Sequence, residues 1–162
     1  MRNITPKEVT PYGEVDSIQF ATYLTKKANE KQVNTNITKI QKWLYICYGL
    51  YWAAENKQLL NERPKAWDYG PAFPKVYKAQ KNHNDTLEPL ITNTDVATFS
   101  VYDDLINSVL DTFGSWTASQ LVNWTHEEGS AWDRQKQNAM YEALDDYNIK
   151  LDFRKILRHD QI

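Results

Sequence analysis

The chain has 162 residues, of which 41% are hydrophobic and 25% charged, so it is long enough for one domain with a sizeable core. Its net charge of −2 argues against a general phosphate-binding surface, and the single cysteine, Cys47, excludes an intramolecular disulfide and a cysteine-based zinc site. Aromatic residues reach 13% while glycine is scarce at five, which excludes a disordered chain and argues against a sandwich, a barrel or a nucleotide-binding fold.

The N-terminal residues 1–13 contain two prolines, one glycine and charges of both signs, which predicts an extended arm. We therefore divide the chain into an arm, residues 1–14, and one domain, residues 15–162. The arm lacks the apolar run of a signal peptide, and the longest apolar stretch, residues 43–54, is too short to span a membrane. We expect a cytoplasmic protein with no membrane partner.

A first helix is predicted directly after the arm. Asp16 or Ser17 can cap it, and it ends near Gln32, because the sequence Val33-Asn34-Thr35-Asn36 breaks the helical pattern.

The strongest predicted element is a second helix over about residues 37–56. Apolar residues recur in it at helical spacing and fill most other sides as well, namely Ile37, Ile40, Trp43, Leu44, Ile46, Cys47, Leu50, Tyr51, Trp52 and Ala53. Only Lys39, Lys42 and Glu55 leave a polar strip, so the helix should be central and buried. Gly49 in its interior costs about 1 kcal/mol relative to alanine, for which a close crossing with another helix is a sufficient reason.

The segment at about 57–74 changes character. Gly70-Pro71 marks a turn, and the aromatic residues Trp67 and Tyr69 precede it. We interpret the segment as an ordered loop with a short two-stranded piece, wedged against the central helix by Trp67 and Tyr69. Pro74 then begins a helix whose Tyr77 should point inward.

The remaining segments complete a mainly α fold. In chain order they are a long polar connection with at most one short strand (83–99), helices at 102–113 and 117–127, a weaker, mostly polar helical stretch (133–144) and apolar residues at helical spacing over 151–157. We expect a single compact helical domain around the central helix, with a short β/loop insertion at about 57–74.

Charge is unevenly distributed along the chain. Residues 1–57 carry an excess of three positive charges, residues 58–99 are balanced, and residues 100–162 carry an excess of five negative charges. Such an acidic segment is ordinarily a solvated face; the alternative is a surface that docks on a basic partner. The acidic candidates for such a surface are Asp145, Asp146 and Asp152.

Signatures of catalysis are absent from the sequence. There is no glycine-rich phosphate loop, His-Glu-x-x-His or Gly-x-Ser-x-Gly, and the three histidines are far apart. A Cys47–His126 dyad is disfavoured, because Cys47 lies in the apolar helix and should be inert. The cluster Thr125-His126-Glu127-Glu128 suggests either acid–base chemistry or a partner contact, or simply a histidine that closes a helix. The loop from Trp67 to Pro71 is equally a binding lip or a loop pinned to the core.

Two stretches of the chain match a known motif set. The first contains Ile40-Gln41-Lys42-Trp43-Leu44-Tyr45, then Ala66-Trp67-Asp68-Tyr69-Gly70-Pro71, then Tyr77. The second contains Leu121, Thr125-His126 and Trp132. In this order they resemble the Panacea domain of SocA-like and phage GepA-like antitoxins, with Trp43 bulkier than the usual leucine and Tyr48 in place of a common glutamine. The motif residues that we take as scaffold or partner-binding candidates are Gln41, Lys42, Tyr45, Trp67, Tyr69, Gly70, Pro71, Tyr77, Thr125, His126 and Trp132.

The resemblance implies a mainly helical antitoxin of a two-gene toxin–antitoxin pair, which neutralises its protein toxin by direct binding at the toxin's active or substrate site. Toxins paired with this family include small alarmone synthetases that inhibit translation, Fic-like enzymes and membrane-acting peptides. Neither a cofactor nor a metal, a small-molecule substrate or direct nucleic-acid binding is expected, and the protein should not be an enzyme.

Three alternatives stay open from the sequence. Some SocA-like relatives are adaptors that deliver a toxin to a cytoplasmic protease. An enzyme that reverses the toxin's modification is the second alternative, for which His126 is the only catalytic candidate. A general interaction protein of a phage or prophage is the third.

Overall fold

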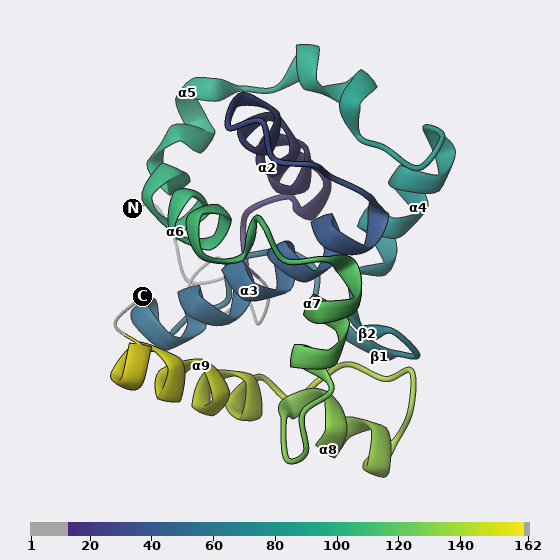
Figure 1. The fold of residues 1–162 in the computed structure, drawn as a ribbon, viewed down its shortest axis with the longest axis vertical. Helices are drawn as coiled ribbons and strands as arrows, with labels where there is room; N and C mark the ends of the chain where they lie inside the picture. Colours follow the sequence, from purple (N-terminus) through teal and green to yellow (C-terminus); the bar gives the residue numbers. More distant parts are fainter. Residues whose placement is uncertain (1–12, 161–162) are drawn as a thin grey trace, which may run out of the picture.

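The computed structural model describes residues 13–160, and all but the last two residues of the predicted arm, 1–14, lie outside them. The elements, in chain order (Figure 1), are α2 (Ser17–Glu30), α3 (Ile37–Glu55), β1 (Lys65–Trp67), β2 (Gly70–Ala72), α4 (Pro74–Asn82), the 3-10 helix η1 (Glu88–Asn93), α5 (Val96–Phe99), the 3-10 helix η2 (Ser100–Tyr102), α6 (Asp103–Phe113), α7 (Ala118–Thr125), α8 (Ala131–Asn138) and α9 (Asp146–Asp160). The predicted mainly α fold is confirmed.

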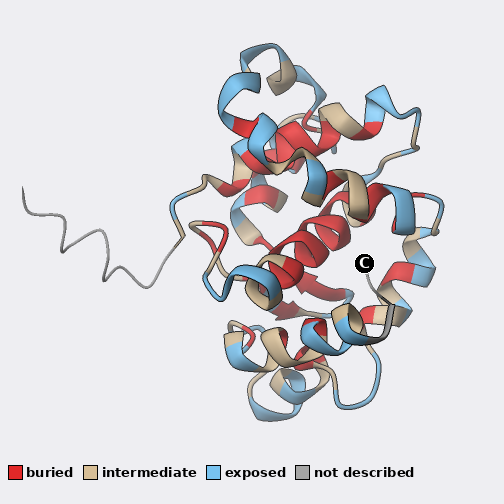
Figure 2. Cartoon of the chain, turned by 90° about the vertical axis from the view of Figure 1, so that its left-hand side faces the viewer, coloured by how far each residue is buried: buried red, intermediate tan, exposed pale blue. Residues whose placement is uncertain are grey.

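Helix α3 is the centre of the domain, as predicted. Every residue from Lys39 to Leu50 is buried. In Figure 1 α3 runs through the middle of the molecule with α2 and α6 above it and α9 below, and in Figure 2 the central helix is coloured as buried along most of its length. None of the helices in the described part combines the length and apolar character needed to cross a bilayer.

The glycine in α3 marks a helix crossing. A Cβ atom on Gly49 would lie 2.1 Å from two ring carbons of Phe153 in α9, a distance at which atoms overlap. The Phe153 ring also packs edge-on against Tyr45, with 5.5 Å between ring centroids. The predicted close crossing at Gly49 is therefore confirmed, and α9 is its partner.

The polar strip on α3 does not face solvent along its first half. Lys39 and Lys42 are both buried, and each ammonium donates to a backbone carbonyl: Lys39 Nζ to Gly114 O at 3.1 Å and Lys42 Nζ to Pro71 O at 3.1 Å. A lysine can reach a carbonyl across a helix interface because its stem is long and apolar. Both lysines thus attach neighbouring segments to the central helix.

The predicted β insertion is a short hairpin. β1 and β2 pair antiparallel, with Ala66 opposite Pro71 and Trp67 opposite Gly70. The far edge of β1 is covered by residues 141–144, because Ala66 N donates to Glu142 O at 3.0 Å and Tyr141 N to Ala66 O at 2.8 Å. The edge of β1 that faces away from β2 is therefore paired within the domain.

One of the two rings predicted to wedge the hairpin against α3 does not do so. Tyr69 lies at the hairpin tip with 75% of its surface exposed, so that prediction was wrong. Trp67 is half-buried and packs edge-on against Tyr77 at 5.2 Å between centroids. A two-residue turn between strands projects its side chains away from the sheet, which accounts for Tyr69.

Three boundaries differ from the predictions. The helix predicted over 133–144 is α8, which ends at Asn138, α2 ends at Glu30 rather than near Gln32, and α9 begins at Asp146, five residues before the apolar repeat at 151–157. Ile149 is buried and stands at helical spacing with Phe153 and Ile156, so the apolar pattern begins earlier than predicted, and only the polar residues 146–148 before it give no such signal. The connection over 83–99, expected to hold at most one short strand, contains η1 and α5.

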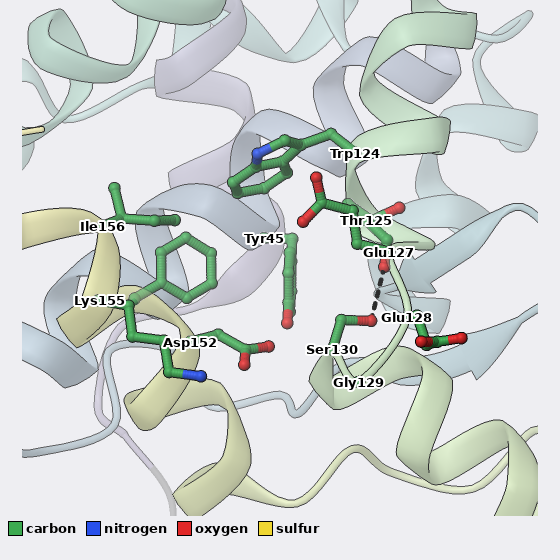
Figure 3. A pocket seen from close by; sticks show the side chains of 11 residues that line it. Tyr45, Trp124, Thr125, Glu127, Glu128, Gly129, Ser130, Asp152, Lys155 and Ile156 are labelled. Carbon is green, nitrogen blue, oxygen red and sulfur yellow. Dashed lines mark hydrogen bonds between the residues drawn. The ribbon is translucent and has the colours of Figure 1, made fainter. Parts of the chain in front are cut away.

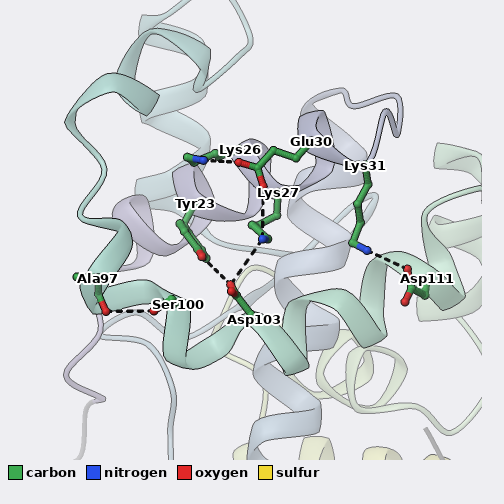
Figure 4. Close-up of polar contacts among 9 residues, drawn as sticks. All are labelled: Tyr23, Lys26, Lys27, Glu30, Lys31, Ala97, Ser100, Asp103 and Asp111. Carbon is green, nitrogen blue, oxygen red and sulfur yellow. Dashed lines mark hydrogen bonds and ion pairs between the residues drawn. The ribbon is translucent and has the colours of Figure 1, made fainter.

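Polar side chains join α2 to α6 (Figure 4). The buried Tyr23 donates its hydroxyl to Asp103 Oδ1 at 2.6 Å, and burial raises the pKa of Tyr23. Lys31 pairs with Asp111 at 3.3 Å at the other end of the same interface. These contacts hold the upper part of the domain, away from the motif residues described next.

Candidate functional site

The motif residues from distant parts of the chain converge on the hairpin. Gly70 is at their centre, because a Cβ atom placed on it would lie 2.6 Å from Thr125 Oγ1 at the end of α7 and 2.8 Å from Lys42 Cε in α3. Gly70 also has a positive φ of 106°, a conformation that side chains with a Cβ rarely adopt. The close packing of Gly70 against Thr125 and Lys42, together with the hydrogen bond from Lys42 Nζ to Pro71 O, fixes the hairpin on α3 and α7.

A second group of motif residues fixes the other strand of the hairpin. Trp132 in α8 donates its indole N–H to Trp67 O at 2.8 Å. The ring of His126 stacks on Trp132, with 3.7 Å between centroids and 12° between planes. The ammonium group of Lys136 lies over the Trp132 ring, with its Nζ atom 5.2 Å from the ring centroid. The C-terminal end of α7 and the start of α8 are thereby joined to the hairpin.

His126 is arranged for packing rather than for proton transfer. Burial lowers the pKa of His126, and the positive charges of Lys42 and Lys136 lower it further, so the neutral imidazole is favoured. Its Nε2 atom is buried and has no hydrogen-bond partner within residues 13–160. Cys47 is fully buried, and burial raises the pKa of its thiol, so the expected inert thiol is confirmed.

Gln41 links α3 to the chain that leaves the hairpin. Its amide oxygen accepts from Phe73 N at 2.7 Å, and its amide nitrogen donates to Phe73 O at 3.3 Å and to Gln80 Oε1 at 3.2 Å. All of these atoms are buried. The Phe73 carbonyl also accepts from Tyr77 N at 2.9 Å, so the Phe73 N–H is the backbone group for which Gln41 replaces a missing strand neighbour. Gln41 is thus a structural residue of the α3–hairpin junction.

The motif residues therefore divide into two groups. Gln41, Lys42, Trp67, Gly70, Pro71, Tyr77, Thr125, His126 and Trp132 contact one another or the hairpin backbone. Tyr45 and Tyr69 remain: Tyr45 lines a pocket on the other side of Thr125, and Tyr69 projects into solvent at the hairpin tip.

The three acidic candidates occupy different environments. Asp145 is exposed. Asp146 is half-buried, accepts from Tyr48 Oη at 2.9 Å and lies 3.4 Å from Arg63 Nε. Asp152 accepts from Ala131 N at 2.7 Å. Burial raises the pKa values of Asp146 and Asp152. Asp145 accepts from Tyr147 N at 2.8 Å, so all three carboxylates already have a partner within the chain.

A pocket opens between α7, the turn that follows it, and α9 (Figure 3). Its volume is about 230 Å³. It is lined by Tyr45, Trp124, Thr125, Glu127, Glu128, Gly129, Ser130, Asp152, Phe153, Lys155 and Ile156. The sequence singled out Thr125, Glu127 and Glu128 as a cluster but gave no sign that α9 would complete the wall.

Two exposed tyrosines were missed by sequence reasoning. Tyr141 is 52% exposed and donates its hydroxyl to Asp68 Oδ1 at 2.8 Å, which places it beside Tyr69 of the hairpin tip. Tyr147 is 59% exposed in the first turn of α9. We call Asp68, Tyr69, Tyr141 and Glu142 the hairpin face. Its only sequence signal was the presence of large rings in otherwise polar segments.

Within residues 13–160 no group of three or more His, Cys, Asp or Glu side chains is placed to hold a metal ion. Next to the scaffold that the motif residues hold together lie two surface features suited to recognition, the hairpin face and the pocket beside α9; two other pockets, between α3 and α6 and between α2 and α5, lie away from the motif residues.

Comparisons with known proteins connect this scaffold to a family. The family model described as "Antitoxin SocA-like, Panacea domain" matches residues 40–133. Antitoxin SocA of Caulobacter vibrioides (strain NA1000 / CB15N) is 28% identical over 130 residues, which span 74% of this chain and 69% of that protein. No solved structure gives a significant match. All eleven motif candidates lie inside the matched range.

Proposed function

Because the chain belongs to the SocA-like antitoxin family with a Panacea domain, we propose that it neutralises a cognate protein toxin by binding it directly and covering the toxin's active or substrate site. The family supports the general antitoxin role in a toxin–antitoxin system. The direct mechanism, the covered site and a cytoplasmic location are our proposal.

The observation that carries the proposal is the hairpin face. Nine of the motif residues are engaged in holding the scaffold, whereas Tyr69 is largely exposed and Tyr141, also exposed, is bonded to the neighbouring Asp68. Tyrosine concentrates binding energy at protein interfaces, because it combines a large apolar ring with a hydroxyl. A fixed scaffold with exposed rings at one edge suits a protein that binds another protein.

The charge of this face indicates the kind of toxin. Asp68 and Glu142 lie next to the two tyrosines and both are exposed. A toxin that acts on tRNA or nucleotides needs a basic substrate site, and an acidic binder is complementary to it. We therefore propose a translation-inhibiting toxin, such as a toxic small alarmone synthetase, as the partner, and no direct contact with nucleic acid.

Co-expression with the product of the adjacent gene tests the proposal. Each gene is placed under its own inducible promoter, growth is scored, and the complex is recovered through a tag on the neighbour and sized by chromatography. We expect growth arrest by the neighbour, rescue by this chain, and a stable complex. Rescue accompanied by loss of the toxin only in cells that contain a cytoplasmic protease would instead identify an adaptor.

Replacing Tyr69 by alanine should weaken the complex about 30-fold without changing the stability of the free chain. A tyrosine at the centre of an interface contributes about 2 kcal/mol, whereas a residue 75% exposed contributes little to folding. Titration calorimetry with the purified toxin measures the first effect and urea unfolding the second. Tyr147→Ala removes an exposed ring outside the hairpin face and should bind as wild type does; equal losses in both variants would argue against this face.

A further inference from the structure

The hydroxyl group of Tyr45 opens into the pocket beside α9. Tyr45 is only 4% exposed, yet its hydroxyl makes no hydrogen bond to any residue in the described range 13–160. The ring is fixed by its edge-on contact with Phe153, and Figure 3 shows the hydroxyl directed into the pocket on the side of Asp152. A hydroxyl that opens into a hollow without a protein partner is free to donate to, or accept from, a ligand atom placed there.

The charge of the pocket favours a cation. Glu127, Glu128 and Asp152 line it, and Lys155 is the one cation among the lining residues. Asp152 uses Oδ2 to accept from Ala131 N and thus keeps an oxygen for another donor. The positive charge of Lys155 offsets one of the three carboxylate charges, so the lining of the pocket keeps an excess of two negative charges.

The walls of the pocket are aromatic. Trp124 packs edge-on against Phe153 with 5.9 Å between centroids, and both rings line the cavity together with Ile156. A flat, weakly hydrated cation with several donors is the group that such walls and carboxylates recognise together, because it can stack on a ring while its N–H groups bond to oxygens. The guanidinium group of arginine has these properties, whereas an anion has none of them.

The pocket adjoins the hairpin. Thr125 lines the pocket and also lies against Gly70, which is one residue from Tyr69. A single partner protein can therefore contact the hairpin tip and reach the pocket.

We propose that this pocket is a socket for an arginine side chain of the cognate toxin, held by the Tyr45 hydroxyl and the carboxylates of Glu127 and Asp152 against the Trp124 ring. This inference rests on the proposed function. It adds a chemically specific anchor to a contact otherwise described only by exposed rings, and it predicts an exposed arginine on the toxin surface.

Variants that keep the fold test the socket in the complex. Tyr45→Phe removes only the hydroxyl and keeps the ring against Phe153, and Glu127→Gln neutralises an exposed carboxylate. Each should raise the dissociation constant of the purified antitoxin–toxin complex about tenfold, the loss expected for one charge-assisted or buried hydrogen bond. Asp104→Asn, which neutralises an exposed carboxylate in α6, is the matched control and should bind as wild type does.

A second measurement examines the free chain. N-acetyl-arginine amide is titrated into the isotope-labelled protein while the indole N–H resonance of Trp124 is followed by NMR. N-acetyl-citrulline amide, which has the same shape without the charge, serves as the control ligand. We expect a saturable shift with the arginine compound that is lost in Glu127→Gln, and no shift with the citrulline compound.

The outcomes separate the socket from the proposed function. A complex that forms with unchanged affinity in Tyr45→Phe and Glu127→Gln overturns the socket and leaves toxin binding intact. Absence of any complex with the adjacent gene product overturns the proposed function, and with it the toxin as the source of the arginine. Equal shifts with both amides, or no shift with either, overturn the recognition of a cationic side chain.

Discussion

Replacing Gly70 by alanine is expected to lower the free energy of unfolding by about 3 kcal/mol, because two penalties combine at this position. The φ angle of 106° is strained for any residue with a Cβ atom. The new methyl group would also lie within 2.6 Å of Thr125 Oγ1 and 2.8 Å of Lys42 Cε. Urea unfolding followed by tryptophan fluorescence measures the change.

The chain provides a control that separates these penalties. Gly129 also has a positive φ, of 83°, but a Cβ atom there would meet nothing within 4 Å. Gly129→Ala should therefore cost about 1 kcal/mol, the strain alone. If both variants lose the same stability, crowding between the hairpin, α3 and α7 is not what makes glycine necessary at residue 70. If the hairpin shifts to relieve the contact, Gly70→Ala should also weaken toxin binding through the displaced Tyr69.

Replacing Lys42 by methionine is expected to abolish a pH-dependent gain in stability. Burial lowers the pKa of the Lys42 ammonium from 10.5 to about 8. Between these values an unfolded chain binds more protons at Lys42 than the folded one, so the contribution of Lys42 to the free energy of unfolding should rise with pH from about 8 to 10.5. The rise attributable to Lys42 is ~3 kcal/mol, and below pH 8 its slope vanishes.

The effect of Lys42 is obtained by measuring the free energy of unfolding against pH for wild type and for Lys42→Met and subtracting one curve from the other. Burial raises the pKa values of Tyr45, Tyr48 and Cys47, and groups of this kind lower stability once the pH exceeds their unfolded pKa values. Those contributions are common to wild type and Lys42→Met and cancel when the two curves are subtracted. Methionine keeps the length and apolar stem of lysine but loses the bond to Pro71 O.

Two features of these curves would contradict the interpretation. Parallel curves for wild type and Lys42→Met above pH 8 would mean that the Lys42 ammonium is not desolvated. A similar difference for Lys78→Met, which removes an exposed lysine from α4, would mean that net charge rather than burial is responsible.

The central helix could be predicted because its apolar residues cover nearly the whole circumference, a pattern that few other structures produce. The start of α9 was placed too late: Ile149 continues the helical spacing of Phe153 and Ile156, and only residues 146–148 before it carry no apolar repeat. The carboxylate of Asp146 is held in place by Tyr48 and Arg63, two residues that lie far away in the sequence. Local spacing cannot reveal an element that distant partners stabilise.

The candidate site, too, could be predicted from the sequence only in part. The motif residues were identified from the sequence, but their role was not, since Gln41 and Lys42 would ordinarily be assigned to a solvated face. Only the structure shows that each satisfies backbone groups of the hairpin or of the chain after it. The pocket beside α9 was beyond sequence reasoning because Tyr45, Glu127 and Asp152 come from three separate elements.

The location of Cys47 has a practical consequence for experiments on this domain. Its sulfur is enclosed in the middle of α3 and is the only thiol of the chain. A cysteine introduced in place of Tyr147, which is exposed and lies outside the hairpin face, would therefore be the single site open to a maleimide dye or a photo-crosslinker. Fluorescence anisotropy of such a conjugate could follow the encounter with a toxin in real time, without first removing the native cysteine from the core.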